Sequence, residues 1–220
     1  MQTTETSHDV LEAATLLVTA GVLSHSGHAI LSGRSGGNRF VVTATDVIRE
    51  LTADQLAIAG LDGGVVEGEL DQENAHVVAM HSVVYRARPD VGGIVHTHSP
   101  AATAFALAHQ PLPCRTEQLL RADQAEALPV APWGPPGSDV PVHRIAAVLA
   151  DWPTTNAVLL ANHGLLAFGA DPLAAARLII AVEDSAQAEL AAARIGGGID
   201  FPPGVLQAAR ESMAKARPAR

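Results

Sequence analysis

The chain has 220 residues, of which 48% are hydrophobic and only 3% aromatic, and its formal net charge is −9. This length predicts a single domain, residues 1–220, with a core built mainly from Ala, Val, Leu and Ile. The acidic charge argues against a nucleic-acid-binding surface. Cys114 is the only cysteine, so an internal disulfide is excluded, and the N-terminus shows no targeting segment. We therefore expect a cytoplasmic protein.

The first half of the chain alternates between helical and strand patterns. Apolar residues recur at helical spacing near the N-terminus, and Asp62-Gly-Gly is a hairpin signal between two short apolar runs. Pro89 ends the next helical pattern. The elements predicted here are a helix over 8–24, strands near 29–31, 39–43, 56–61 and 65–67, and a helix over 74–88.

The second half continues this alternation. Ser138 is the expected cap of one helix, and Asp171-Pro172 opens a long helix that carries too many charges to span a bilayer. The elements predicted here are a strand over 93–98, a helix over 100–109, a strand near 128–131, a helix over 138–150, strands over 157–161 and 165–168, and a helix over 173–195. Residues 201–220 show little pattern and predict a C-terminal tail, mobile over 215–220. Helices mixed with tight hairpins predict a mixed sheet with helices on both faces.

Three histidines stand at the ends of apolar runs. His96 and His98 close the run Val91-Gly-Gly-Ile-Val-His-Thr-His98, and alternate residues of a strand share a face. His163 follows a second apolar run. A His-x-His pair is weak evidence, because ten histidines in this length give about half of one such pair by chance. The strand context adds to this signal, and two interpretations stay open: a metal site with three nitrogen ligands and an open position, as in an enzyme, and ordinary partly buried histidines.

Three motifs in order carry a family resemblance. They are the stretch from His81 through Arg-Pro-Asp to His98, the loop Pro135-Pro-Gly-Ser138, and Asn162-His163-Gly164. Over nearly its whole length the chain resembles the class II aldolase/adducin family. The resemblance implies a three-layer α/β/α fold with a central mixed, largely antiparallel sheet. It also implies a catalytic divalent cation (Zn, Mn, Fe or Co) on His96, His98 and His163, and a homotetramer with active sites between subunits.

The departures from the family pattern bear on the substrate. In the sugar-phosphate aldolases Gly-Asn begins the phosphate-binding loop, whereas this chain has Gly27-His28. Their Ser-Ser-Glu segment has neither serine here, and Val77 stands at the position of the glutamate. A phosphate dianion would be poorly satisfied without these donors, so we expect a substrate that lacks phosphate.

Valine cannot accept a proton, which leaves two candidates for proton transfer. Glu73 lies one helical turn before Val77, and His76 is its immediate neighbour. The alternatives are a solvated carboxylate at a helix start for Glu73 and a surface or interface imidazole for His76.

Relatives with Gly-His at this position include decarboxylases of hydroxylated pyridine dicarboxylates and dihydroxyphthalates. The resemblance therefore implies a metal-dependent decarboxylase of a hydroxylated aromatic dicarboxylate, in which the ion stabilises an enolate-like state. His28 would contact the substrate or relay protons. Arg34, Arg39 or Arg115 would bind a carboxylate through both oxygens, although a surface role is the alternative for each of them.

Two other functions stay open. One is a class II aldolase that cleaves a non-phosphorylated hydroxy-keto acid or sugar, with Glu73 as acid and base. The other is a non-catalytic, adducin-like interaction module, against which the three retained histidines argue. The expected partners are a small carboxylated substrate and further copies of the chain, with neither nucleic acid nor membrane.

Overall fold

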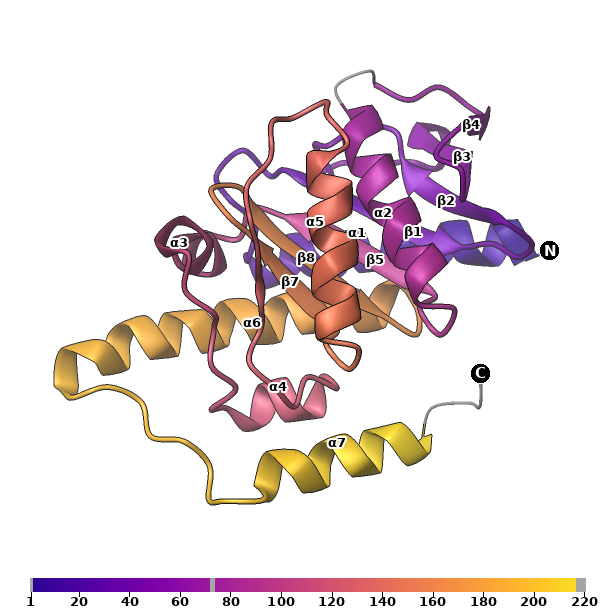
Figure 1. Cartoon of the computed structure of the whole chain (residues 1–220). Helices are drawn as coiled ribbons and strands as arrows, with labels where there is room; N and C mark the ends of the chain where they lie inside the picture. Colours follow the sequence, from indigo (N-terminus) through magenta and orange to yellow (C-terminus); the bar gives the residue numbers. More distant parts are fainter. Residues whose placement is uncertain (1, 72–73, 217–220) are drawn as a thin grey trace.

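The computed structural model describes residues 2–71 and 74–216, and an eight-stranded sheet forms its centre (Figure 1). The strand order is β4-β3-β2-β1-β5-β8-β7-β6, and the only parallel pair among the described strands is β6 with β7. The strands are β1 Ala29–Arg34, β2 Arg39–Thr43, β3 Leu56–Gly60, β4 Val65–Glu67, β5 Gly93–Thr97, β6 Val130–Ala131, β7 Ala157–Leu160 and β8 Gly164–Gly169. The predicted mixed, largely antiparallel sheet is confirmed.

Helices cover both faces of the sheet. The α-helices are α1 Gln2–Ala20, α2 Ala75–Ala87, α3 Pro100–Ala108, α4 Glu117–Arg121, α5 Val140–Asp151, α6 Pro172–Ala192 and α7 Val205–Ala216, with 3-10 turns η1 Ala53–Gln55 and η3 Ala193–Ile195. Side chains of α2 and α5 share one apolar cluster with one face of the sheet, and those of α1, α3 and α6 share a second cluster with the other face (Figure 1). The predicted three-layer α/β/α fold is confirmed.

The central strands are mostly apolar because both of their faces are covered. Every residue of β5 is buried, and β5 lies between β1 and β8. Antiparallel pairing with β1 places His96 opposite Ile30, and pairing with β8 places it opposite Leu166. The sheet therefore carries His96 into the interior and delivers His98 just beyond the end of the strand.

The start of the long helix matches its prediction. Asp171 caps α6 by accepting a hydrogen bond from the amide of Ala174 at 2.7 Å, and Pro172 is the first helical residue. The start of α5 does not match its prediction: the N-cap is Asp139, and the Ser138 hydroxyl donates instead to the carbonyl of Pro135 at 2.7 Å. The proline-rich loop thus uses Ser138 for its own turn.

The prediction of a patternless tail was wrong, because residues 205–216 form α7. Two contacts with distant parts of the chain hold this helix in place. Leu206 packs against the core cluster of α1 and α6, and Arg210 donates to the carbonyl of Ala125 at 2.8 Å. Lys215 lies within α7, and the rest of the predicted mobile end lies outside the described residues. Within the described part of the chain, helices that combine the length and apolarity needed to cross a bilayer are absent.

Candidate metal centre

His96 and His98 lie at the C-terminal end of β5 and on the same side of the sheet, as the strand spacing predicts. The His96 side chain is fully buried, whereas that of His98 is partly accessible. Their ring centroids are 5.1 Å apart, with an angle of 82° between the ring planes. The two imidazoles are therefore close enough to face one small ion.

His163 joins them from the turn between β7 and β8. Asn162 has the left-handed φ of 57°, and the amide of His163 donates to the carbonyl of Leu160 at 3.0 Å. This tight turn places the His163 ring centroid 4.7 Å from that of His96 and 4.9 Å from that of His98. The structure thus brings together the three histidines singled out in the sequence.

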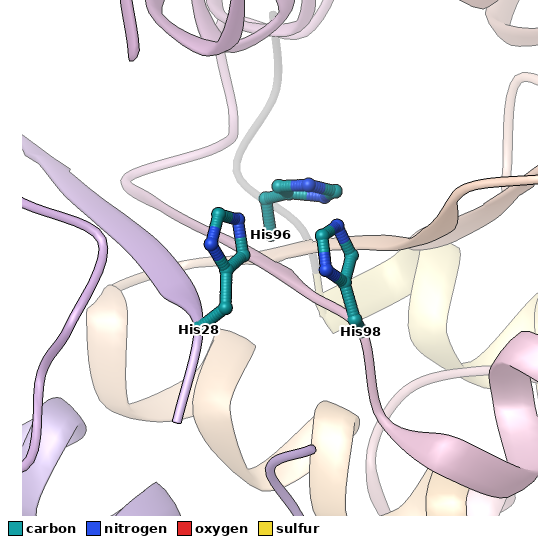
Figure 2. A group of neighbouring side chains, drawn as sticks. All are labelled: His28, His96 and His98. Atoms are coloured by element: carbon teal, nitrogen blue, oxygen red, sulfur yellow. The ribbon is translucent and has the colours of Figure 1, made fainter. Parts of the chain in front are cut away.

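A fourth imidazole, His28, stands in the same group (Figure 2). Its ring is stacked on that of His98 with a centroid distance of 4.3 Å, and its centroid is 5.9 Å from that of His96. One ring nitrogen from each of His28, His96 and His98 lies within 4.8 Å of the others, and His163 is outside this tighter group. His28 is therefore a candidate ligand as well as a candidate substrate contact.

Burial keeps His96, His98 and His163 neutral. Desolvation, reinforced by neighbouring imidazoles, lowers the pKa of His98 to about 4 and that of His163 to about 4, and it also lowers the pKa of His96 well below its usual value. The Nδ1 atom of His96 lies 3.0 Å from the carbonyl of Leu165, which can only accept, so Nδ1 carries the proton and Nε2 has the lone pair. Neutral imidazoles are the form that binds metal ions.

Two nitrogens of the group have no hydrogen-bond partner. The Nε2 atoms of His96 and His98 are buried, and no described residue bonds to either. Buried polar atoms are usually satisfied, so each unsatisfied one needs an explanation. A divalent cation would accept both lone pairs, and its Lewis acidity suits a set of borderline nitrogen donors. The residues present therefore fit the metal ion that the sequence predicts.

A pocket of about 120 Å³ opens beside His163. Its walls come from His76 and Met80 of α2, from the loop that includes Trp133 and Pro136, and from the turn that carries His163. Among the described residues that line it, none is lysine or arginine. The pocket is thus mainly apolar, and its polar side chains include the imidazoles of His76 and His163 and the amide of Asn162.

The three arginines predicted to bind a carboxylate lie elsewhere in this chain. Arg34 ends β1 and donates to the carbonyls of Val91 and Tyr85, each at 2.9 Å. Arg39 lines a separate surface pocket with Arg86. Arg115 forms ion pairs with acidic residues near the end of α6 and in the loop after it. None of the three lines the pocket beside His163.

The remaining candidates are the two proton-transfer residues, His76 and Glu73. His76 lies in the pocket wall, near enough for its charge to contribute to the lowered pKa of His163. Val77 is buried in the layer between α2 and the sheet. Glu73 lies outside the described residues. The interpretation of His76 as a residue of the site is therefore compatible with the structure, and the role of Glu73 stays a prediction.

Sequence reasoning missed Asp46, whose carboxylate oxygen Oδ2 lies 2.8 Å from Nδ1 of His28. It also missed Arg49, which packs on the Gly27-His28 turn. A Cβ added to Gly27 would lie 2.9 Å from Nε of Arg49. Both residues come from the segment after β2, 18 or more positions away in sequence. Only the pairing of that segment with residue 28 could have revealed them.

Residues 8–190 match the model of the Class II Aldolase and Adducin N-terminal domain. The chain belongs to the class II aldolase/adducin family. An L-fuculose 1-phosphate aldolase structure superposes with a TM-score of 0.81 at 24% identity and 96% coverage of both chains, which shows the shared fold.

Curated relatives of this class II aldolase-family protein include both aldolases and a decarboxylase. A 5-deoxy-D-ribulose 1-phosphate aldolase of Bacillus thuringiensis is 35% identical over 118 residues, and the match covers 54% of this chain and about half (52%) of that enzyme. A 3-oxo-tetronate 4-phosphate decarboxylase of Haemophilus influenzae is 29% identical over 73% of this chain and 76% of that enzyme. The similarity therefore supports an enzyme of a lyase family, and it does not separate aldol cleavage from decarboxylation.

Gly164 is a position where this family member tolerates no side chain. A Cβ there would meet the carbonyl oxygen of Thr97 and would lie 2.7 Å from Cδ2 of His98. We expect Gly164→Ala to shift the Thr97 carbonyl together with the His98 ring and to weaken metal binding about tenfold or more. Equilibrium dialysis with Zn(II), together with circular dichroism, checks this. An unchanged affinity for Zn(II) would show that metal binding does not depend on the present position of the His98 ring.

The buried His81 should make the protein less stable to unfolding in acid. It is fully buried, its Nδ1 lies 2.8 Å from the Ser32 hydroxyl, and burial lowers its pKa to about 3. Between pH 6.5 and 3 the unfolded chain binds a proton at this residue and the folded chain does not, so the free energy of unfolding falls as the pH falls. At pH 5 this one group is expected to cost about 2 kcal/mol relative to pH 7.

Urea unfolding of the metal-free protein at pH 7 and pH 5 measures this cost. The variant His81→Gln should lose less stability than the wild type between the two pH values. The matched control His8→Gln alters an exposed histidine and should behave as the wild type does. The same pH dependence in wild type and His81→Gln would contradict the assignment.

Proposed function

We propose that this protein is a metal-dependent carbon–carbon lyase that decarboxylates a hydroxylated aromatic acid of the dihydroxyphthalate or hydroxypyridine dicarboxylate class. The observation that carries the proposal is the convergence of four imidazoles beside a mainly apolar pocket that His163 lines. Two of them, His96 and His98, have a buried Nε2 atom without a hydrogen-bond partner among the described residues. His96, His98 and His163 would hold the ion. When bound, it would act as a Lewis acid on substrate oxygen atoms that gain negative charge as the carbon–carbon bond breaks.

The pocket beside His163 favours a flat, apolar substrate group. Trp133, Met80 and Pro136 offer apolar surface on which an aromatic ring can pack. An ortho-hydroxy acid would present its phenolic and carboxylate oxygens to the histidine cluster and its ring to these walls. The aromatic substrate class rests on this shape and on the Gly27-His28 resemblance.

A phosphorylated substrate is disfavoured by the charge beside His28. The Asp46 carboxylate occupies this end of the site, 2.8 Å from the His28 ring. A carboxylate in this position would repel a phosphate dianion. The phosphorylated sugars named for the relatives are therefore not proposed as substrates here.

Proton transfer is assigned to His76 or Glu73. The His76 ring lines the same pocket as His163, where a ring carbon of the substrate would lie. Decarboxylation requires one proton to be added to the carbon that loses its carboxylate, and carbon dioxide leaves with the rest of that group. His76 can supply this proton and regain it from solvent, because it is partly exposed. Glu73 stays the second candidate for this step.

A second carboxylate on the substrate needs a cation that the pocket of one chain lacks. Arg34, Arg39 and Arg115 do not line this pocket within one protomer. The proposed binding of a carboxylate by any of them therefore requires a site shared between copies of the chain, as in the expected homotetramer.

The alternative function is an aldolase that cleaves a non-phosphorylated hydroxy-keto acid or sugar. The aldolase names among the relatives favour it, since the same ion and pocket could stabilise an enolate formed by aldol cleavage.

A substrate panel separates the two reactions. The purified protein, loaded in turn with Zn(II), Mn(II), Fe(II) and Co(II), is incubated with dihydroxyphthalates, hydroxypyridine dicarboxylates and 4-hydroxy-2-keto acids. We expect carbon dioxide from an aromatic acid and no pyruvate from the keto acids. Aldehyde and pyruvate without carbon dioxide would establish the aldolase instead.

The same assay tests His76. His76→Asn should lower kcat about 100-fold if this imidazole transfers the proton. The matched control His143→Asn alters an exposed histidine on α5 and should leave kcat unchanged. A normal kcat for His76→Asn would transfer the role to Glu73, which Glu73→Gln then tests.

A further inference from the structure

We propose that His28 is a fourth imidazole ligand of the metal ion and that Asp46 holds its ring in the tautomer that ligation requires. This inference rests on the proposed function, because it concerns the same ion as His96 and His98. It goes beyond the family resemblance, which implies His96, His98 and His163 alone.

The bond to Asp46 fixes which nitrogen of His28 has the lone pair. Nδ1 of His28 lies 2.8 Å from the Asp46 carboxylate, an acceptor, so Nδ1 carries the proton. The lone pair of the neutral ring is then on Nε2. Histidines that bind metals commonly donate their other N–H to a carboxylate or a backbone carbonyl. His96 shows the same arrangement with the carbonyl of Leu165.

The backbone holds His28 and Asp46 together, so their contact does not depend on two side chains alone. Residues His28 and Val47 form an antiparallel bridge, and the amide of Ala29 donates to the carbonyl of Asp46 at 2.9 Å. The side chain of His28 is 20% exposed and that of Asp46 37% exposed. Because the carboxylate contacts Nδ1, it lies on the side of the ring away from Nε2, where a residue that supports a metal ligand is expected.

The ring of His28 reaches the space shared by the other imidazoles. Its ligand nitrogen lies within 4.8 Å of those of His96 and His98, as the convergence of the three rings in Figure 2 illustrates. The rings of His28 and His98 are nearly parallel, at 6°. Since an imidazole binds an ion in its own plane, ligation by both requires one ring to turn. His28 is held by Asp46, so His98, whose Nε2 has no hydrogen-bond partner among the described residues, is the ring that turns.

This ligand set would change the character of the site. Val77 supplies no carboxylate at the family's glutamate position, and it is buried against the sheet. Four neutral imidazoles would leave the full charge of the ion to act on substrate oxygens. Nitrogen donors favour Zn(II) and Co(II) over Mn(II), which prefers oxygen donors. We therefore expect the protein to bind Co(II) more tightly than Mn(II).

Co(II) binding to the metal-free full-length protein tests the inference without an activity assay. The dissociation constant is measured by competition with a chelator, and the coordination by the visible absorption of Co(II). We expect His28→Ala and His28→Asn to weaken Co(II) binding about 100-fold and to alter the absorption band, and Asp46→Asn to weaken it about tenfold. The control His25→Ala alters an exposed histidine three residues away and should match the wild type.

The outcomes separate this inference from the proposed function. Wild-type Co(II) affinity and absorption in both His28 variants, with binding lost in His96→Ala, would overturn the role of His28 and leave the metal centre standing. Retained Co(II) affinity in His96→Ala would overturn the metal centre itself. Urea unfolding of each metal-free variant verifies that it folds, and His28→Asn is the variant that keeps a side-chain donor for Asp46.

Discussion

Replacement of His96 by alanine is expected to lower turnover about 1000-fold or more and to abolish tight metal binding. His96 is fully buried, its Nδ1 is committed to the carbonyl of Leu165, and its Nε2 has no partner among the described residues. A catalytic cation contributes several kcal/mol of charge stabilisation, and each 1.4 kcal/mol is a factor of ten in rate. Steady-state kinetics on the substrate found in the panel, with metal content per chain, measure both losses.

A conservative variant distinguishes loss of a ligand from loss of packing. His96→Gln fills much of the same volume, yet it should also fail to bind the ion. The control His143→Gln alters an exposed histidine on α5 that is not part of the cluster. A His96 variant with wild-type turnover and folding would contradict the account of the site.

Replacement of Arg88 by alanine is expected to lower the free energy of unfolding by about 3–5 kcal/mol. Arg88 is 3% exposed and forms a bidentate pair with Asp90, with N–O distances of 2.9 and 2.7 Å. Its Nη1 also donates to the carbonyl of Thr155 at 2.7 Å, and so links the end of α2 to the segment before β7. Removal of the guanidinium leaves a largely buried carboxylate and a buried carbonyl without this donor. Equilibrium unfolding in urea measures the loss.

Arg121 provides the matched control. Its pair with Glu117 is on the surface of α4, where the two side chains are 79% and 72% exposed. Arg121→Ala should change the free energy of unfolding by about 0.5 kcal/mol or less, because solvent screens such pairs. Equal losses for the two arginine variants would show that the Arg88 contacts contribute no more than surface charges do.

Local signals predicted the central elements and the histidines of β5. Short apolar runs mark β5 and β7. Because residues i and i+2 of a strand point to the same side, the sequence also places His96 and His98 together. Asp171-Pro172 marks the start of α6 through its own chemistry. Each of these predictions depends on residues that are neighbours in sequence, which is why the sequence alone suffices for them.

The features that were missed depend on contacts between distant residues. Asp46 meets His28 only because strand pairing brings residues 28 and 47 together. The helix α7 has only three large apolar side chains, Val205, Leu206 and Met213, and its anchors, such as the bond from Arg210 to Ala125, reach a distant part of the chain. Arg34 shows how far residue chemistry alone can be taken: it suits a carboxylate, yet within this chain its guanidinium donates to backbone carbonyls.

Metal removal tests the central claim most directly. The protein is dialysed exhaustively against a chelator, assayed for carbon–carbon bond cleavage, and then titrated with Zn(II) or Co(II) while bound metal is counted. We predict that cleavage disappears on chelation and returns in proportion to the bound metal, with saturation at one ion per chain. Full cleavage by protein that retains less than about a tenth of an ion per chain would contradict a metal centre on these histidines.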